Sequence, residues 1–174
     1  MTASASATRT TPEAAASRLT PRGGEARMAN PAHAVPGAMA ALLDLGTAID
    51  RSGLPVATRE LTHLRASQIN GCGVCGIQHH RTAKRRGETD ERLWGVAGWR
   101  DAPFYTPAER AALALTEAVT RLADTADPVP DGVWTEVATH YDVQQLGALV
   151  LTIASINLWN RLNVTTHQVA GQEW

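Results

Sequence analysis

Apolar residues recur at three- and four-residue spacing through most of the chain, and this period is the feature that most limits its possible folds. Such spacing places side chains on one face of a helix, whereas a half-buried strand would show alternation. Glycine or proline lies between successive segments, where helices begin and end. We find no convincing alternating stretch, so the sequence predicts an all-α fold of about seven helices.

The ends of the predicted helices follow from capping residues. Thr106 with Glu109, and Asp142 with Gln145, are typical of helix starts, and Asn70 with the next glycine is typical of a helix end. The longest helices carry more apolar positions than one small bundle needs, so we expect burial against another subunit. The predicted helices cover residues 36–52, 56–69, 72–87, 89–97, 106–124, about 131–141, and 142 to beyond 159.

Residues 1–27 differ in composition from the rest, being rich in alanine, serine and threonine without an apolar period. They cannot bury enough surface to offset chain entropy, so we predict a disordered N-terminal tail followed by one helical domain over residues 28–174. The whole chain is 44% hydrophobic with a formal net charge of -1. This composition is that of a globular protein and gives no reason to expect nucleic acid or membrane as a partner.

Both cysteines of the chain lie in the stretch "NGCGVCGIQHH", at Cys72 and Cys75. If a helix begins near Cys72, then Cys72, Cys75 and His79 share one face. The amides and dipole of a helix start favour a thiolate, which is the reactive form of cysteine. A hairpin through Gly71 would bring Glu60 of the preceding helix beside them. Two cysteines also fit a reducing compartment, so we expect a cytoplasmic protein.

Three readings of the cysteine pair compete. A structural zinc site needs four ligands, and beyond Cys72, Cys75 and His79 the fourth would be a strained His80 or Glu60. A structural disulfide would close a very small loop, for which the entropy model gives only about 2 kcal/mol. The third reading is a dithiol that opens and closes reversibly, and Glu60 and His79 favour it. We therefore expect no metal and no cofactor.

The stretch "RELTHLRASQINGCGVCGIQHHRTAKRRGE" resembles the core motif of the carboxymuconolactone decarboxylase-like superfamily, on its alkylhydroperoxidase D-like side. The motif is a glutamate twelve residues before the first cysteine, then C-x-x-C, then a histidine four residues on. The stretches "APFYTPAERAALALTEAVT" and "IASINLWNRLNV" are also typical, and the resemblance runs from about Ala29 to Thr166. It implies an all-α fold assembled as trimers or hexamers.

The resemblance also implies thiol peroxidase activity on hydrogen peroxide or organic hydroperoxides. In that scheme Cys75 attacks the peroxide, Cys72 resolves the sulfenic acid as a disulfide, and Glu60 and His79 relay the proton. A dithiol or a lipoyl-bearing protein would then reduce the disulfide. Position alone would favour Cys72 as the more acidic thiol, because it lies nearest the helix start. We follow the resemblance and assign the attack to Cys75.

One departure from the family pattern bears on this scheme. Members with a full relay carry a second histidine just before the second cysteine, and here that position is Val74. Valine cannot relay a proton, so His63 and His80 are candidates to compensate. On the last helix, Asn157, Asn160 and Arg161 form a polar seam that we expect to satisfy buried groups. Two alternatives stay open: a decarboxylase of aromatic catabolism, whose members generally lack the cysteines, and a non-catalytic thiol redox sensor.

Overall fold

The structure is a computed structural model that describes residues 24–171. In this part of the chain every regular element is a helix and there is no strand, which confirms the predicted all-α class. The elements in chain order are α2 (Pro31–Ala34), α3 (Ala38–Asp50), α4 (Val56–Ile69), α5 (Gly73–Arg85), α6 (Asp90–Gly95), the short 3-10 helix η2 (Val96–Gly98), α7 (Pro107–Thr120), α8 (Asp131–His140) and α9 (Val143–Thr165).

Each of the seven predicted helices has a counterpart, and the predicted caps are present. Thr106 with Glu109, and Asp142 with Gln145, each form a capping box at the starts of α7 and α9. The single turn α2 was not predicted; Asn30 caps it by accepting a hydrogen bond from the amide of Ala32. One turn is too short for an apolar period to reveal it.

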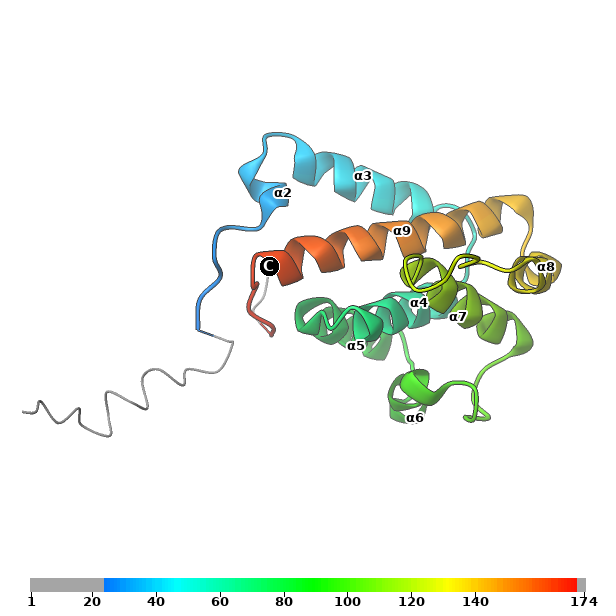
Figure 1. Ribbon diagram of the computed structural model, residues 1–174. Helices are drawn as coiled ribbons and strands as arrows, with labels where there is room; N and C mark the ends of the chain where they lie inside the picture. Colours follow the sequence, from blue (N-terminus) through cyan, green and yellow to red (C-terminus); the bar gives the residue numbers. More distant parts are fainter. Residues whose placement is uncertain (1–23, 172–174) are drawn as a thin grey trace, which may run out of the picture.

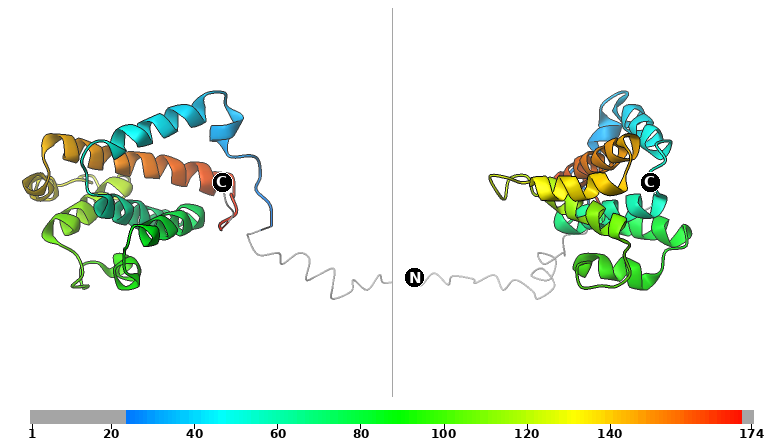
Figure 2. Two further views of the ribbon diagram at one scale, coloured as in Figure 1. Left: turned by 180° about the vertical axis from the view of Figure 1, so that it is seen from behind. Right: turned by 90° about the vertical axis from the view of Figure 1, so that its right-hand side faces the viewer.

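The helices are arranged around α9, which runs through the middle of the molecule (Figure 1). α4 lies below it and contacts α5, α7 and α9, so α4 is the element that joins the lower helices to the centre. α3 crosses on the opposite side of α9 from α4 and α5, as both Figure 1 and the view from behind in Figure 2 show. α4 and α5 form a hairpin, and Gly71 takes the left-handed φ of 65° that its tight reversal needs.

The apolar interior forms three clusters. One lies chiefly between α7, α8 and α9, a second between α4, α5, α6 and α7, and a third surrounds the two cysteines with Ala66, Val74 and Ile156. α9 contributes to two of them and still exposes large apolar side chains, among them Leu151 and Val164. Apolar surface of this kind agrees with the expected contact between subunits, which stays a prediction.

Most of the predicted N-terminal tail lies outside the described residues. At its end, the backbone amide of Arg27 donates to the carbonyl of Thr166, 2.9 Å away, just beyond α9. The boundary at residue 28 therefore stays a prediction. Within residues 24–171, no helix has the length and apolar character needed to cross a bilayer.

Candidate functional site

The two cysteines lie together at the start of α5. Cys72 is the N-cap residue and Cys75 lies in the first turn, and both are free and buried. Their sulfurs are 2.7 Å apart, and the backbone amide of Cys75 donates to the sulfur of Cys72 over 3.3 Å. A disulfide needs about 2.05 Å between the sulfurs, so little movement separates the open from the closed form. The pair is thus within bonding reach, as the reversible-dithiol reading requires.

The two thiols titrate as a unit. The hydrogen bond from the Cys75 thiol is the main cause that lowers the pKa of Cys72 to about 7, and the Cys75 amide adds to it against the effect of burial. The same hydrogen bond, together with burial and the charge on Cys72, raises the pKa of Cys75 far above its ordinary value. The pair therefore loses one proton near neutral pH and keeps the second, with the resting charge on Cys72.

Side-chain amides of α9 hold the cysteine end of α5. Asn163 donates to the sulfur of Cys75 over 3.2 Å and accepts from Asn30 over 2.8 Å. Asn70, in the α4–α5 turn, donates to the side-chain oxygens of Asn157 and Asn160. The predicted polar seam on the last helix therefore forms hydrogen bonds with polar groups in the interior, as expected. Sequence reasoning missed Asn163, although it follows Asn157 and Asn160 at the same three-residue spacing.

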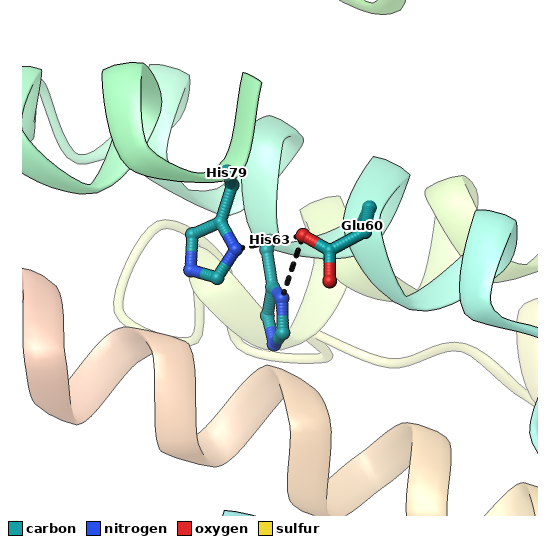
Figure 3. A group of neighbouring side chains, drawn as sticks. All are labelled: Glu60, His63 and His79. Atoms are coloured by element: carbon teal, nitrogen blue, oxygen red, sulfur yellow. Dashed lines mark hydrogen bonds and ion pairs between the residues drawn. The ribbon is translucent and has the colours of Figure 1, made fainter. Parts of the chain in front are cut away.

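Glu60 and His79 meet across the α4–α5 hairpin, as predicted. His79 Nδ1 lies 2.8 Å from Oε2 of Glu60, whose side chain is almost fully buried (Figure 3). Burial opposes ionisation of Glu60, but the imidazoles of His63 and His79 beside it outweigh burial and hold its pKa far below the ordinary value. The carboxylate is therefore charged at neutral pH and can orient the imidazole of His79 through their contact.

His63 also lies beside Glu60 and His79. From the sequence, it was only one of two histidines proposed to compensate for Val74. Its ring lies against that of His79, with the centroids 4.0 Å apart, and its Nδ1 is 3.7 Å from Oε2 of Glu60 (Figure 3). Burial, aided by the charge of His79, lowers the pKa of His63 to about 4, so the ring is neutral at pH 7. His80, the other candidate, lies 6.4 Å from the Trp94 ring instead.

A cavity of about 610 Å³ opens beside these groups. Cys75, His63 and His79 line it, whereas Cys72 does not. Arg59 also reaches the cavity and forms an ion pair of 2.5 Å with Asp50. Most of the remaining wall is apolar and comes from α3 and α9, through Met39, Leu42, Leu43, Ile49, Ile156 and Trp159. The cavity can hold a molecule much larger than water, and Cys75 is the sulfur that such a molecule would reach.

Comparison with known proteins gives the family. The model of the carboxymuconolactone decarboxylase family matches residues 36–118. The uncharacterized protein YdfG of Bacillus subtilis is 38% identical over 129 residues, which cover 74% of this chain and 86% of YdfG. The chain belongs to the carboxymuconolactone decarboxylase family. The uncharacterized protein YnjA of Escherichia coli is 36% identical over 114 residues, 65% of this chain and 60% of YnjA.

Solved structures agree with this membership. A protein of unknown function from Agrobacterium tumefaciens, a candidate antioxidant defence protein AhpD, superposes with a TM-score of 0.78 at 32% identity. The match covers 86% of this chain and all of that one, and it confirms the resemblance to the AhpD-like side of the family. The debrominase Bmp8 has the same fold, with a TM-score of 0.69 at 23% identity over 78% of this chain and 73% of its own.

Proposed function

We propose that this family member is a thiol peroxidase that reduces hydrogen peroxide or organic hydroperoxides through Cys72 and Cys75. The observation that carries the proposal is the pair of free sulfurs at 2.7 Å, one of which borders a cavity shared with His79. A dithiol or a lipoyl-bearing protein would return the electrons, in a reducing compartment such as the cytoplasm. Assembly as a trimer or hexamer is part of this proposal.

The proposed reaction has two steps, and both take place at the two sulfurs. The Cys75 thiolate attacks one peroxide oxygen, the O–O bond breaks, and the alcohol or water leaves with a proton while Cys75 becomes a sulfenic acid. The sulfur of Cys72 then attacks that of Cys75, the S–O bond breaks, and a second water leaves. The two thiols lose two electrons and form the disulfide. Glu60 and His79 would hold the proton taken from the pair and deliver it to the leaving oxygen.

We assign the attacking and resolving roles of the two cysteines from which sulfur a substrate can reach, and not from which thiol is more acidic. Cys72 carries the resting charge, but Cys75 borders the cavity and Cys72 does not. A proton that moves from Cys75 to Cys72 across their 2.7 Å contact transfers the charge to the accessible sulfur. Asn163, which donates to the sulfur of Cys75, would stabilise the charge there. We therefore assign the attack to Cys75 and the resolving step to Cys72.

The test is peroxide consumption in the presence of excess dithiothreitol, measured for the wild type, Cys75→Ser and Cys72→Ser. We expect both variants to lose at least about 100-fold in turnover, since each lacks one half of the cycle. Treated with peroxide in the absence of dithiothreitol, Cys72→Ser should accumulate a sulfenic acid that dimedone labels at Cys75, and Cys75→Ser should not. Unchanged consumption in both variants would refute the proposal, and disulfide formation without repeated turnover would favour a redox sensor.

The decarboxylase alternative fits the cavity less well. A lactone acid would need cations for its carboxylates. Among the described residues that line the cavity, Arg59 is the one guanidinium, and Asp50 already pairs with it at 2.5 Å. The buried cysteines would also have no part in that reaction. The peroxidase gives a part to both cysteines, to Glu60 and to His79, and it is the function that we put forward.

A further inference from the structure

We propose that Glu60, His63 and His79 form a binding site for a divalent transition-metal ion of the zinc class. The site uses His63, which the peroxidase scheme leaves without a part. It differs from a zinc site built on the cysteines, because neither sulfur belongs to it. Figure 3 shows the three side chains converging from α4 and α5.

The positions of the three residues are fixed by two neighbouring helices. Glu60 and His63 are three residues apart on α4 and therefore lie on the same face. His79 comes from α5, which packs against that face in the hairpin. A Glu-x-x-His pair on one helix is a motif by which helical bundles hold divalent metals, and here a histidine of the neighbouring helix adds a third ligand. Such a site stands on rigid elements rather than on a loop.

The distances suit a single ion. One ligand atom from each of the three residues lies within 4.8 Å of the other two. From Oε2 of Glu60, the distances are 2.8 Å to Nδ1 of His79 and 3.7 Å to Nδ1 of His63. Metal–ligand bonds of about 2.0–2.1 Å separate neighbouring ligands by about 3.0–3.4 Å. Shifts of about half an ångström or less would therefore bring each histidine atom to that separation from Oε2 of Glu60.

An unpartnered polar atom points independently to a ligand. Nδ1 of His63 is buried and has no hydrogen-bond partner, and within the described residues it is the one buried side-chain nitrogen or oxygen in that condition. It faces the carboxylate of Glu60 at a distance too long for a hydrogen bond. A buried polar atom without a partner carries a cost in free energy. A metal ion between His63 and Glu60 would remove that cost.

The charge around the three residues permits a cation. A carboxylate and neutral imidazoles are the forms of these side chains that bind metals. Arg59 lies 3.9 Å from the other carboxylate oxygen of Glu60, but its ion pair with Asp50 offsets its charge. Two imidazoles and one carboxylate suit zinc and similar ions better than calcium or magnesium, which prefer oxygen.

The open coordination positions would face the cavity, because His63 and His79 line it. An ion there would replace the direct 2.8 Å contact between His79 and Glu60. If the proposed peroxidase mechanism holds, the same ion would withdraw both residues from proton transfer. The ion would then act as an inhibitor of the peroxidase, and this consequence rests on the proposed function.

Binding can be tested without any turnover. Zn²⁺ binding is measured by equilibrium dialysis on the Cys72→Ser/Cys75→Ser double variant, which has no thiols, and on His63→Ala and His80→Ala in the same background. We expect one ion per chain in the double variant, a loss of at least about 100-fold in affinity in His63→Ala, and no change in His80→Ala. His79→Ala serves as a second site variant if His63→Ala unfolds by circular dichroism.

Two results with the same variants would refute the proposed metal site. Loss of binding in the double variant would place the ion on the sulfurs, and equal affinity in His63→Ala would remove His63 from the shell. Co²⁺ gives a second readout, because the visible spectrum of the wild type should show imidazole and carboxylate ligation without a sulfur-to-cobalt band.

The activity measurement separates this proposal from the proposed function. Zn²⁺ should slow peroxide consumption by the wild type at least about tenfold and EDTA should reverse it, whereas His63→Ala, relative to its own metal-free rate, should resist zinc at the same concentration. Equal inhibition of both proteins would overturn the competition with the relay. A metal-free wild type without peroxidase activity would refute the proposed function alone, because the dialysis result stands without it.

Discussion

At the scale of single residues, the reactivity of the site depends on what lies within hydrogen-bonding distance of each sulfur. The two sulfurs share a hydrogen bond of 2.7 Å, Cys72 also accepts from the amide of Cys75, and Cys75 accepts from Asn163. Since the thiol donor is the largest cause of the low pKa of Cys72, the acidity of this cysteine is a property of the pair. The amide at the helix start adds a smaller contribution.

Replacing Cys75 with alanine should therefore make Cys72 less acidic. In the wild type, absorbance at 240 nm should rise as the first thiolate forms with an apparent pKa of about 7, and peroxide consumption should rise with pH over the same interval. In Cys75→Ala the apparent pKa should move up toward the ordinary thiol value of about 8.5. An unchanged titration would show that the helix start, and not the second thiol, sets the acidity.

At the scale of elements, Glu117 of α7 ties several helices together. Its carboxylate accepts hydrogen bonds from Arg65 of α4 at 2.7 Å, from Trp99 at 3.0 Å and from Arg100 at 2.7 Å. Burial opposes its ionisation, but these three donors hold its pKa below the ordinary value. The contact fixes α4, and therefore Glu60 and His63, against the rest of the bundle.

Glu117→Gln should lower the free energy of unfolding by about 2–4 kcal/mol at pH 7, because it leaves Arg65 partly buried without its counter-charge. Urea denaturation measures this loss. The control Glu136→Gln changes an exposed carboxylate of α8 and should cost less than about 0.5 kcal/mol. A loss as small as that of the control would show that Glu117 does not tie the helices.

The same carboxylate gives a pH dependence with a definite sign. Because the pKa of Glu117 is lower in the folded state, its contribution is complete above the ordinary value of 4.5 and is lost as the pH falls from there toward the folded pKa. The stability difference between wild type and Glu117→Gln should therefore shrink below about pH 4.5. A difference that stays constant into acid would show that Glu117 has an ordinary pKa.

At the scale of the whole molecule, the cavity beneath α3 determines what reaches Cys75. Gly46 of α3 lines it, and a Cβ atom built at this glycine meets no other atom within 4 Å. A large side chain at Gly46 can therefore enter the cavity without disturbing the helix. The cavity is large and mostly apolar, so bulky organic hydroperoxides should depend on it more than hydrogen peroxide does.

Gly46→Phe should raise the KM for cumene hydroperoxide at least about tenfold and leave that for hydrogen peroxide within about twofold. Steady-state kinetics with both peroxides measures the difference. Gly46→Ala is the matched control, since it adds a Cβ atom and favours the helix without filling the cavity. Equal effects of Gly46→Phe on both peroxides would show that the cavity does not select substrates by size.

The sequence by itself determined the helices and the meeting of Glu60 with His79. Apolar period and capping residues act within a few positions, so they fix where a helix lies and which side chains share its face. Gly71 permits the tight reversal, and because the connection is short, the two helices of the hairpin pack side by side. For that reason local spacing is enough to place the carboxylate, the imidazole and the cysteines together.

Only the tertiary structure decided what else reaches the site. Helical spacing shows that His63 shares a face with Glu60. It does not show that this face lies toward His79 and the cavity. Asn163 of α9 contacts Cys75 of α5, and the cavity is lined by residues of α3, α4, α5 and α9. Contacts between segments far apart in the chain depend on how whole faces pack, and local periodicity carries no information about that choice.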